Sequence, residues 1–156
     1  MQDGLRDALA RLPAGVVLVS TRLGKGFRGL TATSFTSVSG DPPLVLVCLD
    51  RLSSTCQGVT ESGAFNVSVL GRSQEFFAER FSGRAPAVDS AWAGIPHRLG
   101  SNQIPILAGS IAWLECSLEA IHSAGDHEVA VGRVHSCGSV TGDPLVLWER
   151  AFWGLA

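Results

Sequence analysis

The chain has 156 residues, of which 46% are hydrophobic and 17% charged, and its formal net charge at pH 7 is −2. This length and composition fit a single folded domain over residues 1–156 and argue against a disordered chain. The near-neutral charge, with 12 scattered Lys and Arg residues, argues against a nucleic-acid or membrane partner, and no apolar run reaches the roughly 18 residues that span a membrane.

The N-terminal residues predict a short amphipathic helix. Leu5, Leu9 and Leu12 recur at helical spacing. Asp3 is placed to cap this helix, and Pro13 ends it. Because the segment carries two Asp and lacks the apolar stretch of a secretory signal, we expect the protein in the cytoplasm.

Seven segments combine β-branched or alternating apolar residues with turn residues at their ends, which is the pattern of β-strands. The predicted strands span residues 15–22, 28–35, 42–50, 64–70, 110–120, 128–140 and 144–148. Most neighbours are joined by turns rather than by helices. We therefore expect a mainly β fold with short helices, built as a closed, antiparallel, Greek-key-like barrel with the helices packed outside.

Two more helices and one long loop complete the prediction. The first helix spans residues 53–62 and is followed by a glycine. The second begins at a Ser73 cap and places Phe77 and Phe81 on one face. Residues 83–107 contain three Pro, so we expect a long irregular loop there.

The four cysteines are widely spaced and form no C-x-x-C pair: Cys48, Cys56, Cys116 and Cys137. A chain of this size needs no disulfides, so we expect all four to be reduced and packed as small apolar residues. The four histidines do not pair with them at zinc-ligand spacing, so no metal site is expected.

The stretch from Thr31 to Ser39 is rich in hydroxyl groups, with six Ser or Thr among nine residues. Composition alone favours an edge strand with a solvated Ser/Thr face. The alternative is one wall of a cofactor site, where hydroxyl and backbone N–H groups meet the polar edge of a flat heterocycle.

Two shorter motifs also carry possible chemistry. The stretch from Asp50 to Thr55 lies between a predicted buried strand and a helix, where free N–H groups and hydroxyls suit a phosphate, although a plain helix cap explains it too. His127 follows the Gly125-Asp126 turn. Its ring is either an exposed bystander or an imidazole at the barrel mouth, oriented by Asp126.

In their order along the chain, these segments resemble the flavin reductase family of FMN-binding split β-barrels, the reductase partners of two-component flavin monooxygenases. The matching stretches cover nearly the whole chain: residues 12–17, 29–35, 38–44, 53–55, 65–70, 81, 125–127 and 132–134. The resemblance implies a split barrel with NAD(P)H-dependent flavin reductase activity. FMN, with FAD as the alternative, is the implied cofactor, and NADH or NADPH is the implied co-substrate. The implied partners are a second copy in a homodimer and a separate oxygenase component.

The resemblance also implies roles for individual residues. His127, the implied catalytic residue, would lie beside the nicotinamide and position the dinucleotide. The residues implied to face the isoalloxazine and ribityl chain are Thr31, Ala32, Thr33, Ser34 and Ser37. Those implied at the ribityl and phosphate end are Asp50, Arg51, Leu52, Ser53, Ser54 and Thr55, and Phe81 and Arg84 complete the cofactor set.

The chain departs from the family pattern in two places. Where the family often has Lys and Phe after an Asp of the long loop, this chain reads Asp89-Ser-Ala-Trp92, so one cationic contact to the cofactor would fall to Arg80 or Arg84. The tail is aromatic, but the protein contains no Tyr. Its aromatic residues, together with the low charge, suggest a buried interface: Trp148, Phe152 and Trp153.

Two alternatives stay open. One is a split barrel that binds flavin but reduces another acceptor, such as a metal complex, or only binds FMN. The other is a non-enzymatic β-barrel interaction domain, in which the hydroxyl-rich stretch is a solvated edge. Bound flavin makes a protein yellow, which separates the second alternative, and NADH consumption with added flavin separates the first.

Overall fold

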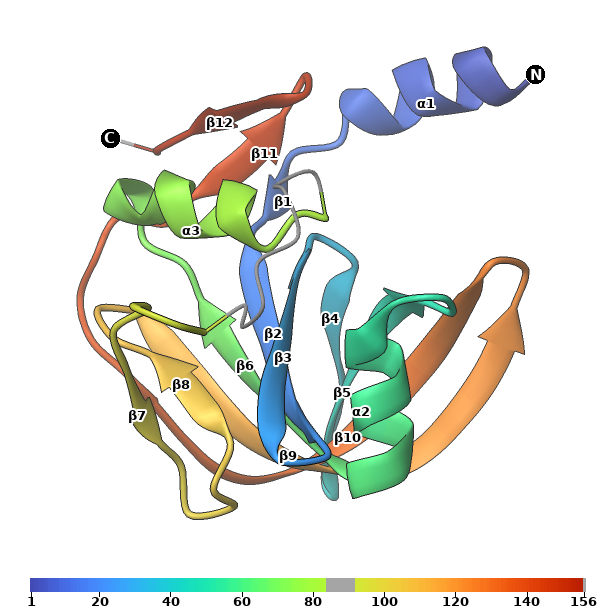
Figure 1. Ribbon diagram of the computed structural model, residues 1–156. Helices are drawn as coiled ribbons and strands as arrows, with labels where there is room; N and C mark the ends of the chain where they lie inside the picture. The colour runs from blue at the N-terminus through green and yellow to red at the C-terminus, as the bar shows by residue number, and fades with distance from the viewer. Residues whose placement is uncertain (84–91, 156) are drawn as a thin grey trace.

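The computed structural model describes residues 1–83 and 92–155 (Figure 1). Its helices are α1 (Gln2–Ala10), α2 (Ser54–Ser62), the 3₁₀ turn η1 (Arg72–Gln74) and α3 (Glu75–Arg80). Its strands are β1 (Ala14–Gly15), β2 (Val17–Leu23), β3 (Gly26–Ala32), β4 (Phe35–Gly40), β5 (Pro43–Asp50), β6 (Ala64–Val69), β7 (His97–Leu99), β8 (Pro105–Leu107), β9 (Ala112–Ala124), β10 (His127–Ser139), β11 (Val146–Trp148) and β12 (Ala151–Trp153). The predicted mainly β fold with short helices is confirmed.

The main sheet is antiparallel and has seven strands in the order β3-β2-β6-β9-β10-β5-β4. It curls into a barrel, as Figure 1 shows. The expectation of a closed barrel is wrong, because no ladder among the described residues joins the edge strands β3 and β4. Only Thr33 and Ser34 separate these strands, and the bend sends β4 to pair with β5 while β3 pairs with β2. The barrel is therefore split between consecutive strands.

The side chains of β2 face two separate cores. Val17 and Val19 point into the barrel, where they meet residues such as Phe65. Leu18 packs into a second cluster with Leu145 and other residues of α3 and the C-terminal tail. Because β2 is buried on both faces, its Val- and Leu-rich sequence shows little alternation, as expected for a central strand.

Helix α1 differs from the prediction at its start. The N-cap position belongs to Met1 and no side chain caps the helix, so the expected Asp3 cap is wrong. Asp3 lies within the first turn, where its negative charge interacts favourably with the helix dipole. The expected apolar stripe is present but uncovered, since Leu5 and Leu9 each keep more than half of their surface exposed.

Helix α2 follows the prediction. The Ser53 Oγ accepts a hydrogen bond from the Cys56 N–H at 3.0 Å, and Gly63 ends the helix with a φ of 66°. Gly58 lets the helix lie directly on β2, because a Cβ there would approach the Arg22 carbonyl oxygen to 2.7 Å. The middle of α2 is thereby packed closely against the barrel.

The predicted cap at Ser73 is wrong. Residues 72–74 form the 3₁₀ turn η1, in which the Gln74 Oε1 accepts from the Gly71 N–H at 3.0 Å, and α3 begins after it. The buried Gln74 side chain therefore serves the free N–H group at this turn, and the exposed Ser73 hydroxyl does not cap α3. Phe77 and Phe81 do reach the same core cluster, as their spacing predicts.

The expected irregular loop over residues 83–107 is wrong for its second half. Strands β7 and β8 form a small antiparallel hairpin in which His97 pairs with Leu107. Three-residue strands, one of them beginning at Pro105, are too short to produce a visible alternation. The expected cofactor residue Arg84 and Asp89, which begins the segment that departs from the family pattern, lie outside the described residues.

The C-terminal tail forms a hairpin that was predicted only in part. Strand β12 returns along β11 after a turn at Glu149 and Arg150, both with positive φ. Trp148 and Trp153 are exposed and meet edge to face, with ring centroids 6.0 Å apart. Phe152 instead packs against the second core cluster.

All four cysteines are free thiols, as predicted. Cys56 and Cys116 are buried, and burial raises the pKa of Cys116 to about 12, which keeps that thiol protonated and unreactive. Cys137 is exposed, so the expected apolar packing is wrong for this residue, which lies near the end of β10.

No described helix has the length and apolar character needed to cross a bilayer.

Candidate functional site

The register of the sheet brings the three predicted motifs to one end of the barrel. His127, the first residue of β10, lies opposite Asp50, the last residue of β5. On the other edge of β5, the Ser34 hydroxyl donates to the Cys48 carbonyl at 3.0 Å and accepts from the Cys48 N–H at 3.2 Å. Segments separated by more than 70 residues in sequence therefore meet around the end of β5.

The loop after β5 is tightly folded on itself. The Asp50 carboxylate accepts from the Leu52 N–H at 2.8 Å, and the Asp50 carbonyl accepts from the Ser53 N–H and hydroxyl. Since Ser53 also caps α2, its hydroxyl has a structural role. Ser54 is exposed at the first turn of α2, Thr55 is buried, and Leu52 projects into solvent.

His127 is held by its neighbour in the turn. Its Nδ1 lies 2.7 Å from the Asp126 Oδ1, and this hydrogen bond lowers the pKa of the Asp126 carboxyl below its usual range. An ionised Asp126 makes Nδ1 the protonated ring nitrogen and fixes the direction of the imidazole. The His127 side chain is 45% exposed, so the ring remains accessible to a small molecule.

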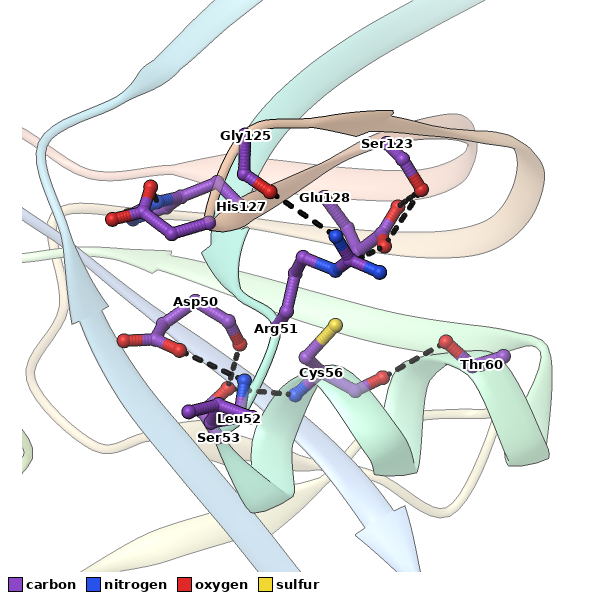
Figure 2. A network of polar contacts seen from close by, with 11 residues as sticks. Asp50, Arg51, Leu52, Ser53, Cys56, Thr60, Ser123, Gly125, His127 and Glu128 are labelled. Atoms are coloured by element: carbon purple, nitrogen blue, oxygen red, sulfur yellow. Dashed lines mark hydrogen bonds and ion pairs between the residues drawn. The ribbon is translucent and has the colours of Figure 1, made fainter.

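Arg51 connects the loop to this turn (Figure 2). Its Nη1 donates to the Gly125 carbonyl at 3.1 Å, and its Nε lies 3.1 Å from the Glu128 Oε1. The Glu128 carboxylate also accepts from the Ser123 hydroxyl. In Figure 2 the Arg51 side chain extends toward the turn, whereas the Asp50 carboxylate points away from it.

A cleft of about 800 Å³ lies on the other side of the hydroxyl-rich stretch. Its lining comes from the end of β3, from α3 and from the C-terminal hairpin: Val16, Thr31, Ala32, Thr33, Glu75, Phe76, Ala78, Glu79, Arg80, Ser82, Leu147, Arg150, Ala151 and Phe152. The Thr31 hydroxyl donates to the Ala78 carbonyl at 2.6 Å, which ties β3 to α3. Residues 31–33 thus line the cleft while Ser34 reaches β5.

Two predicted residues take different places around the cleft. Arg80 lines it, as its candidacy for a cationic contact requires. The Phe81 ring is 3% exposed and packs against Trp92, with ring centroids 5.0 Å apart, while its carbonyl accepts from the Thr31 N–H at 2.9 Å. Phe81 therefore supports the wall of the cleft from behind.

Sequence reasoning missed the residues that the C-terminal hairpin and α3 bring to the cleft. Phe76, Leu147 and Arg150 line it, but none stands near the motifs in sequence. The aromatic tail was the available signal, since it marked a surface in need of a partner. Its docking beside α3 depends on the β1–β11 pairing, which no local pattern reveals.

The arrangement suits binding and alignment of a planar cofactor. The cleft volume lies within the range of small-molecule sites, and its walls combine apolar side chains with a few hydroxyls and charges. A helix start with an exposed hydroxyl offers a place for an anion, and an oriented imidazole stands nearby.

Comparisons with known proteins agree with this reading. The family model described as a flavin reductase like domain matches residues 9–156. The chain is 36% identical over 153 residues to the reductase component of a 4-hydroxyphenylacetate 3-monooxygenase from Thermus thermophilus, covering 97% of this chain and 95% of that protein. It is similar to the solved structure of a Streptomyces globisporus NADH:FAD oxidoreductase in complex with NAD and FAD fragments, with a TM-score of 0.92, 33% identity and coverage of 99% and 93%. A relative from Rhizobium meliloti is 42% identical over 132 residues, or 83% of this chain, but the chain spans only 41% of that longer protein.

Proposed function

Since the chain belongs to the family of flavin reductase-like domains, we propose that it is an NADH-dependent flavin reductase that supplies reduced flavin to a separate oxygenase. The observation that carries this proposal is the meeting of the hydroxyl-rich stretch, the loop 50–55 and the turn 125–127 at one end of the barrel. When flavin and NADH are bound, they supply the chemistry, which is hydride transfer from the nicotinamide to the flavin.

The donors at this end of the barrel fit a flavin. In this proposal residues 31–34 and Ser37 hold the ring and ribityl chain, with the cleft beside them as the space for an apolar ring system. The loop 50–55 and the start of α2 hold the phosphate through the exposed Ser54 and its neighbour Thr55. FMN is the proposed flavin and FAD the alternative, and NADPH is the alternative to NADH.

The residues of the chain contribute alignment rather than acid–base chemistry. Hydride transfer requires the two reacting atoms to approach to about 3–3.5 Å, and holding them there is the main catalytic task. His127, fixed by Asp126, orients the nicotinamide in this proposal. A proton-transfer catalyst is not needed for this step.

Steady-state NADH oxidation with FMN, FAD and riboflavin in turn tests the proposed function. We expect protein-dependent NADH consumption that saturates with flavin, together with slower consumption of NADPH. Flavin binding without turnover would instead support a flavoprotein with another acceptor. A protein that neither binds flavin nor consumes NADH would support the non-enzymatic interaction domain.

We also propose that the chain forms a two-fold homodimer, through the outer face of β5 and β10 rather than through the aromatic tail, whose Phe152 packs against the second core cluster. On these strands the residues that point away from the core are apolar and partly exposed: Leu46 lies opposite Val131, and Cys48 lies opposite Val129. Asp50 and His127 continue the same outer face at its end. A partner seated there would lie beside the candidate site.

Static light scattering tests the dimer. At micromolar concentration we expect a mass of twice the 16.4 kDa chain. Leu46→Glu places a charge in the proposed interface and should shift the protein toward monomer, because an unpaired buried charge costs several kcal/mol. Lys25→Glu, on the exposed turn between β2 and β3, is the control for the added carboxylate and should leave the mass unchanged. A monomeric parent protein would contradict this proposal.

A further inference from the structure

Arg51 directs its hydrogen-bond donors to the turn that carries His127. Its backbone N–H donates to the Asp126 carbonyl at 3.1 Å, its Nη1 donates to the Gly125 carbonyl, and its Nε pairs with the Glu128 carboxylate (Figure 2). One residue of the loop thus bonds to three of the four residues from 125 to 128.

We propose that Arg51 is a positioning residue: it holds the turn 125–128, and through it His127, in the place from which the imidazole meets NADH. This inference rests on the proposed function. It differs from the role implied by the resemblance, in which Arg51 contacts the flavin itself. In this role Arg51 links two parts of the candidate site, because it belongs to the loop 50–55 and bonds to the turn that carries His127.

The chemistry of the contact suits an arginine. The guanidinium is a rigid planar fork, so one arm reaches a carbonyl oxygen while another part of the group pairs with a carboxylate. Glu128 is the sheltered partner, with its side chain 15% exposed, and the Ser123 hydroxyl holds it from the opposite side at 2.9 and 3.0 Å. Cys56 is buried in the first turn of α2, the helix that follows the loop.

The turn needs such a tie. Only Gly125 and Asp126 join β9 to β10, both are exposed, and Gly125 has a φ of 65°. Figure 1 shows the β9–β10 hairpin extending past α2 at the edge of the barrel. Strand ends in such a position open locally at low free-energy cost unless other contacts hold them. The Arg51 bonds supply those contacts from the side of α2.

Two variants, one that removes a positive charge and one that removes a negative charge, separate the positioning role of Arg51 from phosphate binding. Arg51→Met removes the side-chain donors, and Glu128→Gln removes the charge of their partner while keeping an acceptor. If Arg51 acts through the turn, both changes should raise the KM for NADH, by about tenfold and about threefold, with the FMN Kd within twofold of the parent. If Arg51 holds the phosphate, Arg51→Met weakens FMN binding and Glu128→Gln does not.

Hydrogen exchange of the protein without flavin gives a readout that does not depend on activity. We expect Arg51→Met to speed exchange of the amides in residues 125–128 by about tenfold. Arg11→Met is the matched control: it breaks an exposed ion pair with Glu149, away from the outer face of β5 and β10, and should leave exchange of the turn unchanged.

The outcomes are distinct. Unchanged exchange in Arg51→Met, or weaker FMN binding with a normal KM for NADH, overturns the positioning role. If the parent protein fails to oxidise NADH with any flavin, the proposed function fails instead, and the exchange experiment still decides whether Arg51 holds the turn.

Discussion

His127→Ala is expected to lower kcat/KM for NADH by about a hundredfold while leaving the FMN Kd nearly unchanged. The imidazole is fixed by the Asp126 carboxylate at 2.7 Å and is accessible at the end of β10. Displacement of a hydride donor by about 1 Å can reduce the rate on the order of a hundredfold. Steady-state kinetics at saturating flavin and varied NADH measure the effect. Lost binding raises KM, and lost alignment lowers kcat as well.

His122→Ala is the control for this variant. His122 is an exposed imidazole on β9 of the same hairpin and lies opposite Val129. We expect its kinetics to match those of the parent. If kcat and the KM for NADH in His127→Ala also match the parent, His127 is a bystander of the turn.

The double change Ser54→Ala and Thr55→Ala is expected to weaken FMN binding by at least about tenfold. Each hydrogen bond to a charged group contributes about 1.5–3 kcal/mol, and a factor of ten corresponds to about 1.4 kcal/mol. Ser53 is left in place because its hydroxyl caps α2. Fluorescence titration with FMN measures the change.

Riboflavin and Thr60→Ala make this prediction specific. Riboflavin has no phosphate, so its affinity should change far less than that of FMN in the double variant. Thr60 lies further along α2, where its hydroxyl donates to the Cys56 carbonyl at 3.0 Å, so Thr60→Ala removes a hydroxyl away from the helix start. Unchanged FMN affinity in the double variant, with the fold intact, would remove the phosphate from this site.

Local sequence patterns predicted most of the barrel because its long strands are rich in apolar and β-branched residues, which mark them as buried. The apolar run of β5 and the Ser53 and Gly63 signals around α2 are local features, because each depends on neighbours in the sequence. The prediction at Asp3 failed because α1 begins before this residue, at Gln2. The prediction at Ser73 failed because a neighbouring polar side chain takes the free N–H group there. At η1 the side chain of Gln74 serves the Gly71 N–H, a choice that local spacing does not determine.

The candidate site was predictable as a set of motifs but not as a network. The pairing of Asp50 with His127 requires the register of β5 on β10. The Arg51 contact with Gly125 joins residues 74 apart, so sequence reasoning attached Arg51 to the nearest feature, the start of α2. The cleft was not predicted either, because its lining residues are far apart in the sequence. Phe76 and Arg150, for example, come together only when the C-terminal tail folds back beside α3.

The most direct test of the central claim is anaerobic mixing of NADH with the protein and FMN, followed by the absorbance of oxidised flavin. We predict that the yellow colour disappears at a rate that rises with protein concentration and saturates with NADH. An absorbance that decays no faster than in a mixture of NADH and FMN without protein would contradict the assignment of this chain as a flavin reductase.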